Sequence, residues 1–164
     1  MISKKMAEAL NTQIQAEFDS AYLYLAMSAE ADARNFKGMG KWLRVQHQEE
    51  LGHGYKLVEH LLDRGGRVQL KALDAPPAEF GTPLALFEQV YKHEQHVTAL
   101  IHKLYETAGA EKDLAAQVFL QWFVTEQVEE EQQASAIVEK LRLAGDKGST
   151  LLYLDKEFGK RGKD

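Results

Sequence analysis

Glu50 and His53 are two side chains that can bind a metal, and they lie three positions apart in the sequence. On an α-helix this spacing places both side chains on one face. Leu43, Leu57 and Leu61 fall on the same face, with the spacing of a buried helical stripe. A carboxylate and an imidazole are therefore expected to point into the protein core. A charge buried there costs several kcal/mol, roughly, unless a partner compensates it.

Three further segments carry polar side chains on an otherwise apolar stripe. Glu17 interrupts the first stripe, Glu94 interrupts another, and Gln127 and Glu130 interrupt the last. Glu94 follows Glu17 by 77 positions, and Glu130 follows His53 by the same 77. The chain therefore reads as two helical hairpins that carry equivalent polar layers about a pseudo-twofold axis.

Carboxylates that converge in a dry core repel one another and resist ionisation. Two divalent cations would balance four such charges. A set of oxygen ligands with one imidazole fits neither structural zinc nor an all-oxygen calcium cage, and suits Fe(II) or Mn(II), with iron favoured for redox chemistry. We predict that Glu50 bridges two ions. Glu17 and His53 would complete one ion, and Glu94 and Glu130 the other.

Gln127 is a poor metal ligand, so we interpret it as a hydrogen-bonding group beside the site.

Composition restricts the class of protein. The 164 residues suit one domain with its own core. A net charge of −5 argues against non-specific nucleic-acid binding, and the absence of cysteine excludes disulfides and thiolate metal sites. No apolar run is long enough to span a membrane, and Met1–Lys5 leads into an amphipathic helix instead of a signal-peptide core. A cytoplasmic location is expected.

The periodicity predicts an all-α fold with four long helices and a short fifth. The expected ranges are about Ser3–Arg34, Lys41–Arg64, Leu84–Ala108, Asp113–Ala144 and Leu151–Phe158. Residues 35–40, which include two glycines, are expected to form a turn. A single domain is expected over residues 1–158, followed by a flexible tail at 159–164.

The segment from Gly65 to Pro83 loses the helical period and contains all three prolines. A helix of about 24 residues is about 36 Å long, and nineteen extended residues reach roughly 60 Å. The segment can therefore return along the whole bundle and leave the second and third helices parallel. Thr82 is expected to cap the third helix, with Pro83 at its first position.

The chain resembles bacterial non-haem ferritins over essentially its whole length. The motifs that carry the resemblance are Glu17, QEELGH at 48–53, YKHEQ at 91–95 and LQWFVTEQVEEE at 120–131. The general ferritin-like pattern has Glu-x-x-His on two helices, whereas here the last helix carries Gln127-x-x-Glu130. This is the ferritin form, and Gly52 cannot replace the haem-ligand methionine of bacterioferritins, so no haem is expected.

The resemblance implies a ferroxidase centre that binds two Fe(II), transfers their electrons to O2 or H2O2, and delivers Fe(III) to a mineral inside a 24-subunit shell. It also implies a third iron site at Glu49, Glu126 and Glu129 together with Glu130. Tyr24 matches the tyrosine thought to supply an electron during the reduction of oxygen. Trp122 is a second candidate donor, although packing is its more common role.

Three alternatives remain open from the sequence. One is a ferritin-like di-iron oxidase or peroxidase that stores nothing, and a second is a haem-free protein of the bacterioferritin type. The third is a helical interaction bundle without metal. The remaining histidines form no closed ligand set and are interpreted as surface or interface residues: His47, His60, His93, His96 and His102.

Overall fold

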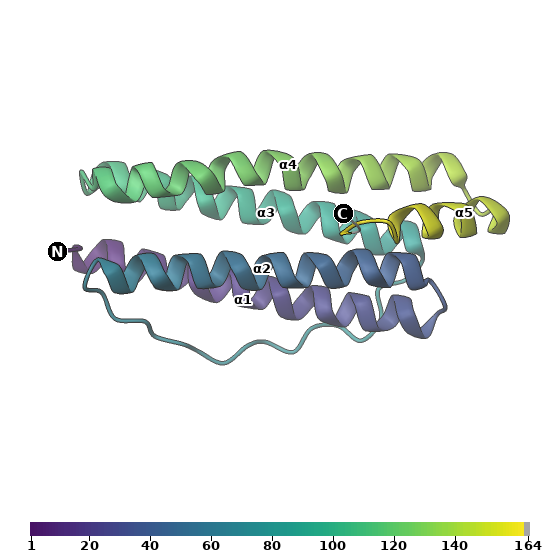
Figure 1. Ribbon diagram of the computed structural model, residues 1–164, viewed down its shortest axis with the longest axis horizontal. Helices are drawn as coiled ribbons and strands as arrows, with labels where there is room; N and C mark the ends of the chain where they lie inside the picture. Colours follow the sequence, from purple (N-terminus) through teal and green to yellow (C-terminus); the bar gives the residue numbers. More distant parts are fainter. Residues whose placement is uncertain (163–164) are drawn as a thin grey trace.

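The computed structural model describes residues 1–162, and these form five α-helices without a strand. Their bounds are α1 Lys4–Ala33, α2 Lys37–Asp63, α3 Pro83–Ala110, α4 Leu114–Ala144 and α5 Gly148–Phe158. Helices α1 and α2 form one hairpin and α3 and α4 form the other, with α5 packed at one end of the bundle (Figure 1). The predicted four-helix bundle with a short fifth helix is confirmed. Within the described residues, no helix is both long enough and apolar enough to cross a lipid bilayer.

Side-chain caps begin three of the long helices. Ser3 Oγ accepts a 3.1 Å hydrogen bond from the Met6 backbone N–H, and Thr82 Oγ1 accepts one of 3.1 Å from Ala85. At the start of α4, Asp113 Oδ1 accepts a 3.0 Å hydrogen bond from the Ala116 backbone N–H. Each cap satisfies an N–H that has no partner within its helix. The predicted Thr82 cap is therefore present, with Pro83 at the start of α3.

The long crossover between α2 and α3 runs beside the first hairpin along the length of the bundle (Figure 1). It brings the chain back to the end where α2 began, so α2 and α3 run parallel, as predicted. Asn11 fixes the start of the crossover, because its amide donates to Arg67 O at 2.9 Å and accepts from Gln69 N at 2.7 Å.

The turn predicted at residues 35–40 is wrong, because α2 already begins at Lys37. Asn35 makes the turn with a φ of 65°. Gly38 instead permits a close approach between α2 and α5, since a Cβ there would lie 1.6 Å from the Asp155 carbonyl oxygen. The Asp155 carboxylate accepts hydrogen bonds from the backbone N–H groups of Gly38 and Met39, at 3.0 and 2.8 Å. Helix α5 is therefore fixed to the N-terminus of α2.

Two apolar clusters fill the bundle, one on each side of a polar layer. The cluster nearer α5 includes Trp42, Phe87 and Phe158, and the other includes Leu57 and Leu120. All five of these side chains are buried. The polar side chains between the clusters are consequently shielded from water along the bundle axis.

Residues 159–162 lie against α2, in contrast to the flexible tail expected there. The guanidinium of Arg161 lies 4.2 Å from the ring centre of Trp42 and contacts Gln46 and Glu49. The Gly38 contact that fixes α5 explains this placement, because it brings the end of α5 to the side of α2. Residues 163–164, the rest of the expected tail, lie outside the residues that the structure describes.

Candidate metal centre

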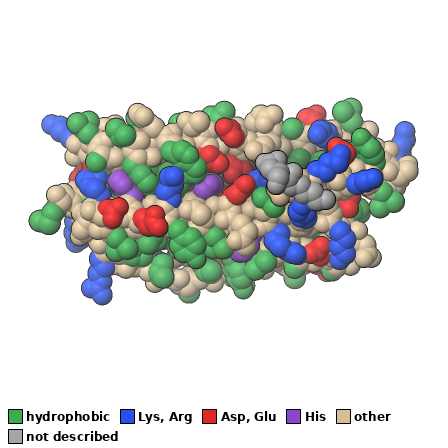
Figure 2. Space-filling model, in the orientation of Figure 1, with side chains coloured by type: hydrophobic (Ala, Val, Ile, Leu, Met, Phe, Trp, Pro, Cys, Tyr) green, Lys and Arg blue, Asp and Glu red, His purple; other side chains and the backbone are tan. Residues whose placement is uncertain are grey.

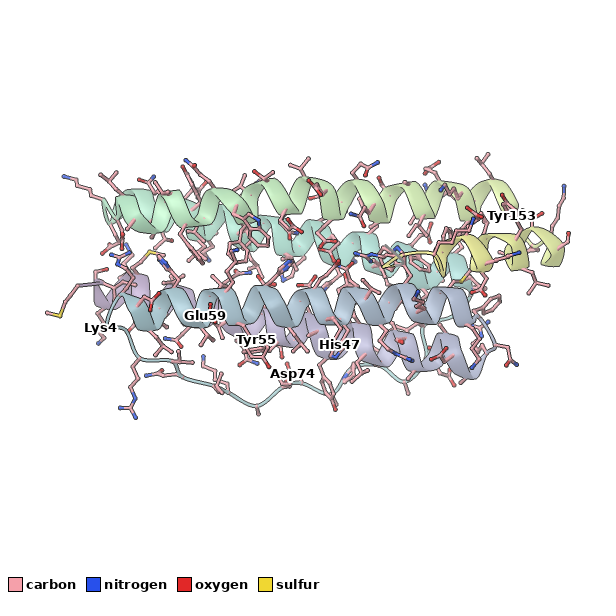
Figure 3. All side chains as sticks on the ribbon, in the orientation of Figure 1. Lys4, His47, Tyr55, Glu59, Asp74 and Tyr153 are labelled. Atoms are coloured by element: carbon pink, nitrogen blue, oxygen red, sulfur yellow. The ribbon has the colours of Figure 1, made fainter. Side chains whose placement is uncertain are left out.

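The polar layer contains six side chains from four helices, and all are at most 6% exposed: Glu17, Glu50, His53, Glu94, Gln127 and Glu130. Oxygen and nitrogen atoms are visible between the helices midway along the bundle in Figure 3. In the same view the labelled His47 and Tyr55 extend from α2 toward the crossover, away from this layer. The predicted inward face of α2 is therefore the face that carries Glu50 and His53.

Glu17, Glu50 and His53 form the tightest part of the layer. One ligand atom from each lies within 4.8 Å of the others. Glu50 Oε2 is 3.3 Å from His53 Nδ1, and Gln13 donates a 2.8 Å hydrogen bond to Glu17 Oε1. The Oε2 atoms of both carboxylates are buried without a hydrogen-bond partner. Because buried polar atoms almost always have a partner, two such oxygens beside an imidazole fit a metal ion.

A second group joins His53 with Glu126 and Glu130, whose ligand atoms also lie within 4.8 Å of one another. His53 Nε2 lies 4.0 Å from Glu126 Oε1. Thus His53 belongs to both groups, with its two ring nitrogens facing different carboxylates. The group contains Glu126, whereas Glu94 was the acid predicted beside Glu130.

Glu94 is buried in the same layer, but hydrogen bonds hold its carboxylate. Tyr24 donates its hydroxyl hydrogen to Glu94 Oε1, and Gln127 Nε2 donates to Glu94 Oε2 at 3.3 Å. Gln127 also lies 3.3 Å from Thr98 Oγ1. The amide of Gln127 therefore orients an acid instead of facing the centre as a free ligand.

Burial and mutual repulsion raise the pKa values of these acids. Desolvation is the largest cause for Glu17, Glu50 and Glu94, and neighbouring carboxylates add to it for Glu17 and Glu50. Desolvation followed by the charge of Glu94 raises the pKa of Glu130 to about 7. Burial and the charge of Glu94 also raise the pKa of the Tyr24 hydroxyl. Protons therefore compete with cations for this layer at neutral pH.

The residues expected at a third metal position are only partly brought together. Glu126 joins His53 and Glu130, as described above, whereas Glu49 is paired with Arg161. Glu129 is exposed on α4. Figure 2 shows acidic side chains gathered beside a histidine near the middle of the face in view.

A model of the ferritin-like domain family matches residues 7–144 of the chain. The ferritin-like domain therefore covers all four long helices of the bundle. The chain belongs to the ferritin family. A bacterial non-heme ferritin from Bacteroides fragilis is 45% identical over 161 residues, which cover 98% of this chain and 100% of the relative.

Other ferritins agree with this assignment. A bacterial non-heme ferritin from Staphylococcus aureus is 37% identical over 164 residues, covering 100% of this chain and 99% of the relative. An open pore ferritin from the archaeon Archaeoglobus fulgidus has a TM-score of 0.97 and 55% identity, covering 98% of this chain and 99% of that one. As a ferritin, the chain has iron storage with ferroxidase activity as its function, and iron is its substrate.

Three side chains around this ferritin centre were not given a role from the sequence. Gln13 and Gln46 each lie four positions before an acid of the layer and donate hydrogen bonds to that acid. The i,i+4 spacing was the signal that could have identified them. The third, His93, was interpreted as a surface or interface residue, without a contact to this layer. It is half-buried, with Nε2 2.8 Å from Ser20 Oγ and its ring edge-on to Tyr24.

The raised pKa of Glu130 predicts how pH affects the metal-free ferritin. The folded state binds this proton more tightly than the unfolded chain, so stability falls as pH rises from about 4.5 through about 7. A shift of this size corresponds to about 3 kcal/mol of the free energy of unfolding. Urea unfolding in chelator at pH 5 and pH 8 measures the loss. In Glu130→Gln the loss should be smaller by this amount, and equal losses in both proteins would contradict the assignment.

Proposed function

We propose that two Fe(II) ions bind in the polar layer of each subunit and are oxidised there. Glu50 bridges them, Glu17 and His53 complete one ion, and Glu94 and Glu130 complete the other. The observation that carries the proposal is the pair of buried, unpartnered Oε2 atoms on Glu17 and Glu50 beside His53. The two ions supply electrons to O2 or H2O2, and Fe(III) leaves for storage.

The surrounding side chains prepare the layer for this chemistry. Gln13 and Gln46 donate to Glu17 and Glu50, which favours the ionised carboxylates that a cation requires. Glu94 must exchange its contacts with Tyr24 and Gln127 for an ion, or share its oxygens with one. Tyr24 is thereby placed directly on an acid of the centre, which supports a role as electron donor.

Anaerobic Fe(II) titration tests the pair. Two ions per subunit are expected to bind at this pair at neutral pH, apart from the third ion proposed below, with release of protons from acids whose pKa is raised. Binding no greater than that of buffer would favour a helical bundle without metal. Mixing the loaded protein with O2 or with H2O2 and following the decay of Fe(II) then identifies the preferred oxidant.

We further propose that the product is stored inside a homo-oligomeric shell of 24 subunits in the cytoplasm, with no haem and no nucleic-acid or membrane partner. The ferritin matches over nearly the whole chain support this assembly. Light scattering after iron loading separates it from a di-iron oxidase or peroxidase that stores nothing. A monomer or dimer that oxidises iron would support the non-storing enzyme.

A third iron ion is proposed beside the pair, with Glu49, Glu126, Glu129 and Glu130 as its acids. The convergence of Glu126 and Glu130 on His53 supports this position. Glu126→Ala and Glu129→Ala are each expected to lower the number of ions bound from three to two while fast oxidation at the pair continues. Anaerobic titration gives the count and stopped-flow absorbance gives the rate. An unchanged count in either variant would remove that residue from the ligand set.

A further inference from the structure

The C-terminal turn, residues 159–162, places the positive charge of Arg161 at the edge of the metal centre. Arg161 Nη1 donates a 2.8 Å hydrogen bond to Gln46 Oε1, and Nη2 donates to the Glu49 carboxylate. The guanidinium also stacks on Trp42. The Arg161 side chain is only 15% exposed. Two hydrogen bonds at its edges and the Trp42 ring against its face fix the position of this guanidinium, unlike that of a solvated surface arginine.

Gln46 connects this guanidinium to the acids of the pair. Its Nε2 donates to Glu50 Oε1 at 3.1 Å and to Glu130 Oε2 at 2.8 Å. Because arginine offers only donors, it requires the carbonyl oxygen of Gln46 to face it. The amide nitrogen is thereby directed at the two carboxylates. One positive charge is therefore separated from the bridging acid by a single side chain.

Glu49 is engaged by this cation instead of by the metal groups. Its carboxylate is absent from both clusters of ligand atoms found in residues 1–162, although Glu126, in the equivalent position 77 residues later, is present in one. A carboxylate paired with a guanidinium has its charge compensated and part of its oxygen lone pairs occupied. A metal ion can use Glu49 only if the guanidinium releases it.

We propose that the Arg161 guanidinium occupies the position at the Glu49 carboxylate that the third iron ion would take. The third ion then binds only as the guanidinium leaves. The C-terminal turn is then a positioning element whose release is coupled to occupation of the third position. The proposal rests on the proposed function, because it takes Glu49 as an acid of the third iron site. The coupling is reciprocal, so loss of the arginine charge must tighten binding of the third ion.

Titration calorimetry of the assembled, metal-free protein with Zn²⁺, which undergoes no redox reaction, tests the proposal. In Arg161→Gln the third equivalent is expected to bind about tenfold more tightly, or ~1.4 kcal/mol, while the first two are unchanged. Lys160→Gln is the matched control, since it removes the same charge one residue earlier, where the side chain pairs with Glu157. Arg161→Lys keeps the charge without the fork that spans two acceptors, and should lie between these variants.

Trp42 provides a second readout that a purely structural role would not change. The chain has two tryptophans, so Trp122→Phe leaves Trp42 as the sole emitter and keeps an aromatic ring against His53. The third Zn²⁺ equivalent should change Trp42 emission as the guanidinium leaves, and should have no such effect when Arg161→Gln is added.

Two results would overturn the proposal and leave the third site intact. They are equal third-ion affinities in the wild type and Arg161→Gln, and a third equivalent that binds without changing Trp42 emission. If neither protein binds a third ion while both bind two, the third site itself fails and this proposal fails with it. Loss of all binding in the wild type would instead reject the di-iron centre.

Discussion

Glu50→Ala is expected to reduce the rate of rapid Fe(II) oxidation by about 100-fold or more, because it removes the ligand shared by both ions. Glu50 is 1% exposed, lies 3.3 Å from His53 and receives a hydrogen bond from Gln46. Stopped-flow absorbance after mixing Fe(II)-loaded protein with O2 measures the rate.

The matched control is Glu59→Ala, which removes an exposed carboxylate from the same helix. This variant should oxidise iron at the wild-type rate. Circular dichroism should show helical Glu50→Ala protein, because removal of a buried acid relieves repulsion from Glu94 and Glu130. A folded Glu50→Ala protein with wild-type oxidation rates would show that Glu50 does not bridge the ions.

Gly38→Ala is expected to undock α5 from α2, with a loss of about 2–4 kcal/mol in the free energy of unfolding. The added Cβ would lie 1.6 Å from the Asp155 carbonyl oxygen, which belongs to backbone and cannot rotate away. Displacement of α5 also removes the Asp155 hydrogen bonds to the start of α2. Hydrogen exchange should show reduced protection across residues 148–162.

Gly52→Ala is the control on the same helix. A Cβ at Gly52 meets nothing within 4 Å, so alanine should stabilise α2 by about 0.5–1 kcal/mol. Chemical unfolding of both variants gives the comparison. Equal stabilities would show that Gly38 is not required for the approach of α5.

Periodicity was sufficient to place the acids. Glu17, Glu50, Glu94 and Glu130 each fall on a long apolar stripe, and all four are buried. Long helices make such predictions reliable because a stripe of many turns fixes which face is inward. The 77-residue spacing added the expectation of matched depth, since it places acids at equivalent levels of two hairpins.

The residues that periodicity missed depend on contacts between elements. Gly38 was read as a turn residue because glycine marks both turns and close backbone approach, and only the position of α5 separates the two. Arg161 lies between Gly159 and Gly162 in a short tail without a period, so its contact with Glu49 depends on how α5 docks. His93 lies beside the inward stripe, and its burial depends on the small Ser20 of α1 opposite it.

Anomalous diffraction at the iron edge, from crystals soaked with Fe(II) without oxygen, is the most direct measurement of the di-iron centre. We expect two peaks per subunit in the polar layer, one beside Glu17 and His53 and one beside Glu94 and Glu130, with Glu50 in contact with both. Density for water alone among these acids, or iron bound only at exposed carboxylates, would contradict the central claim.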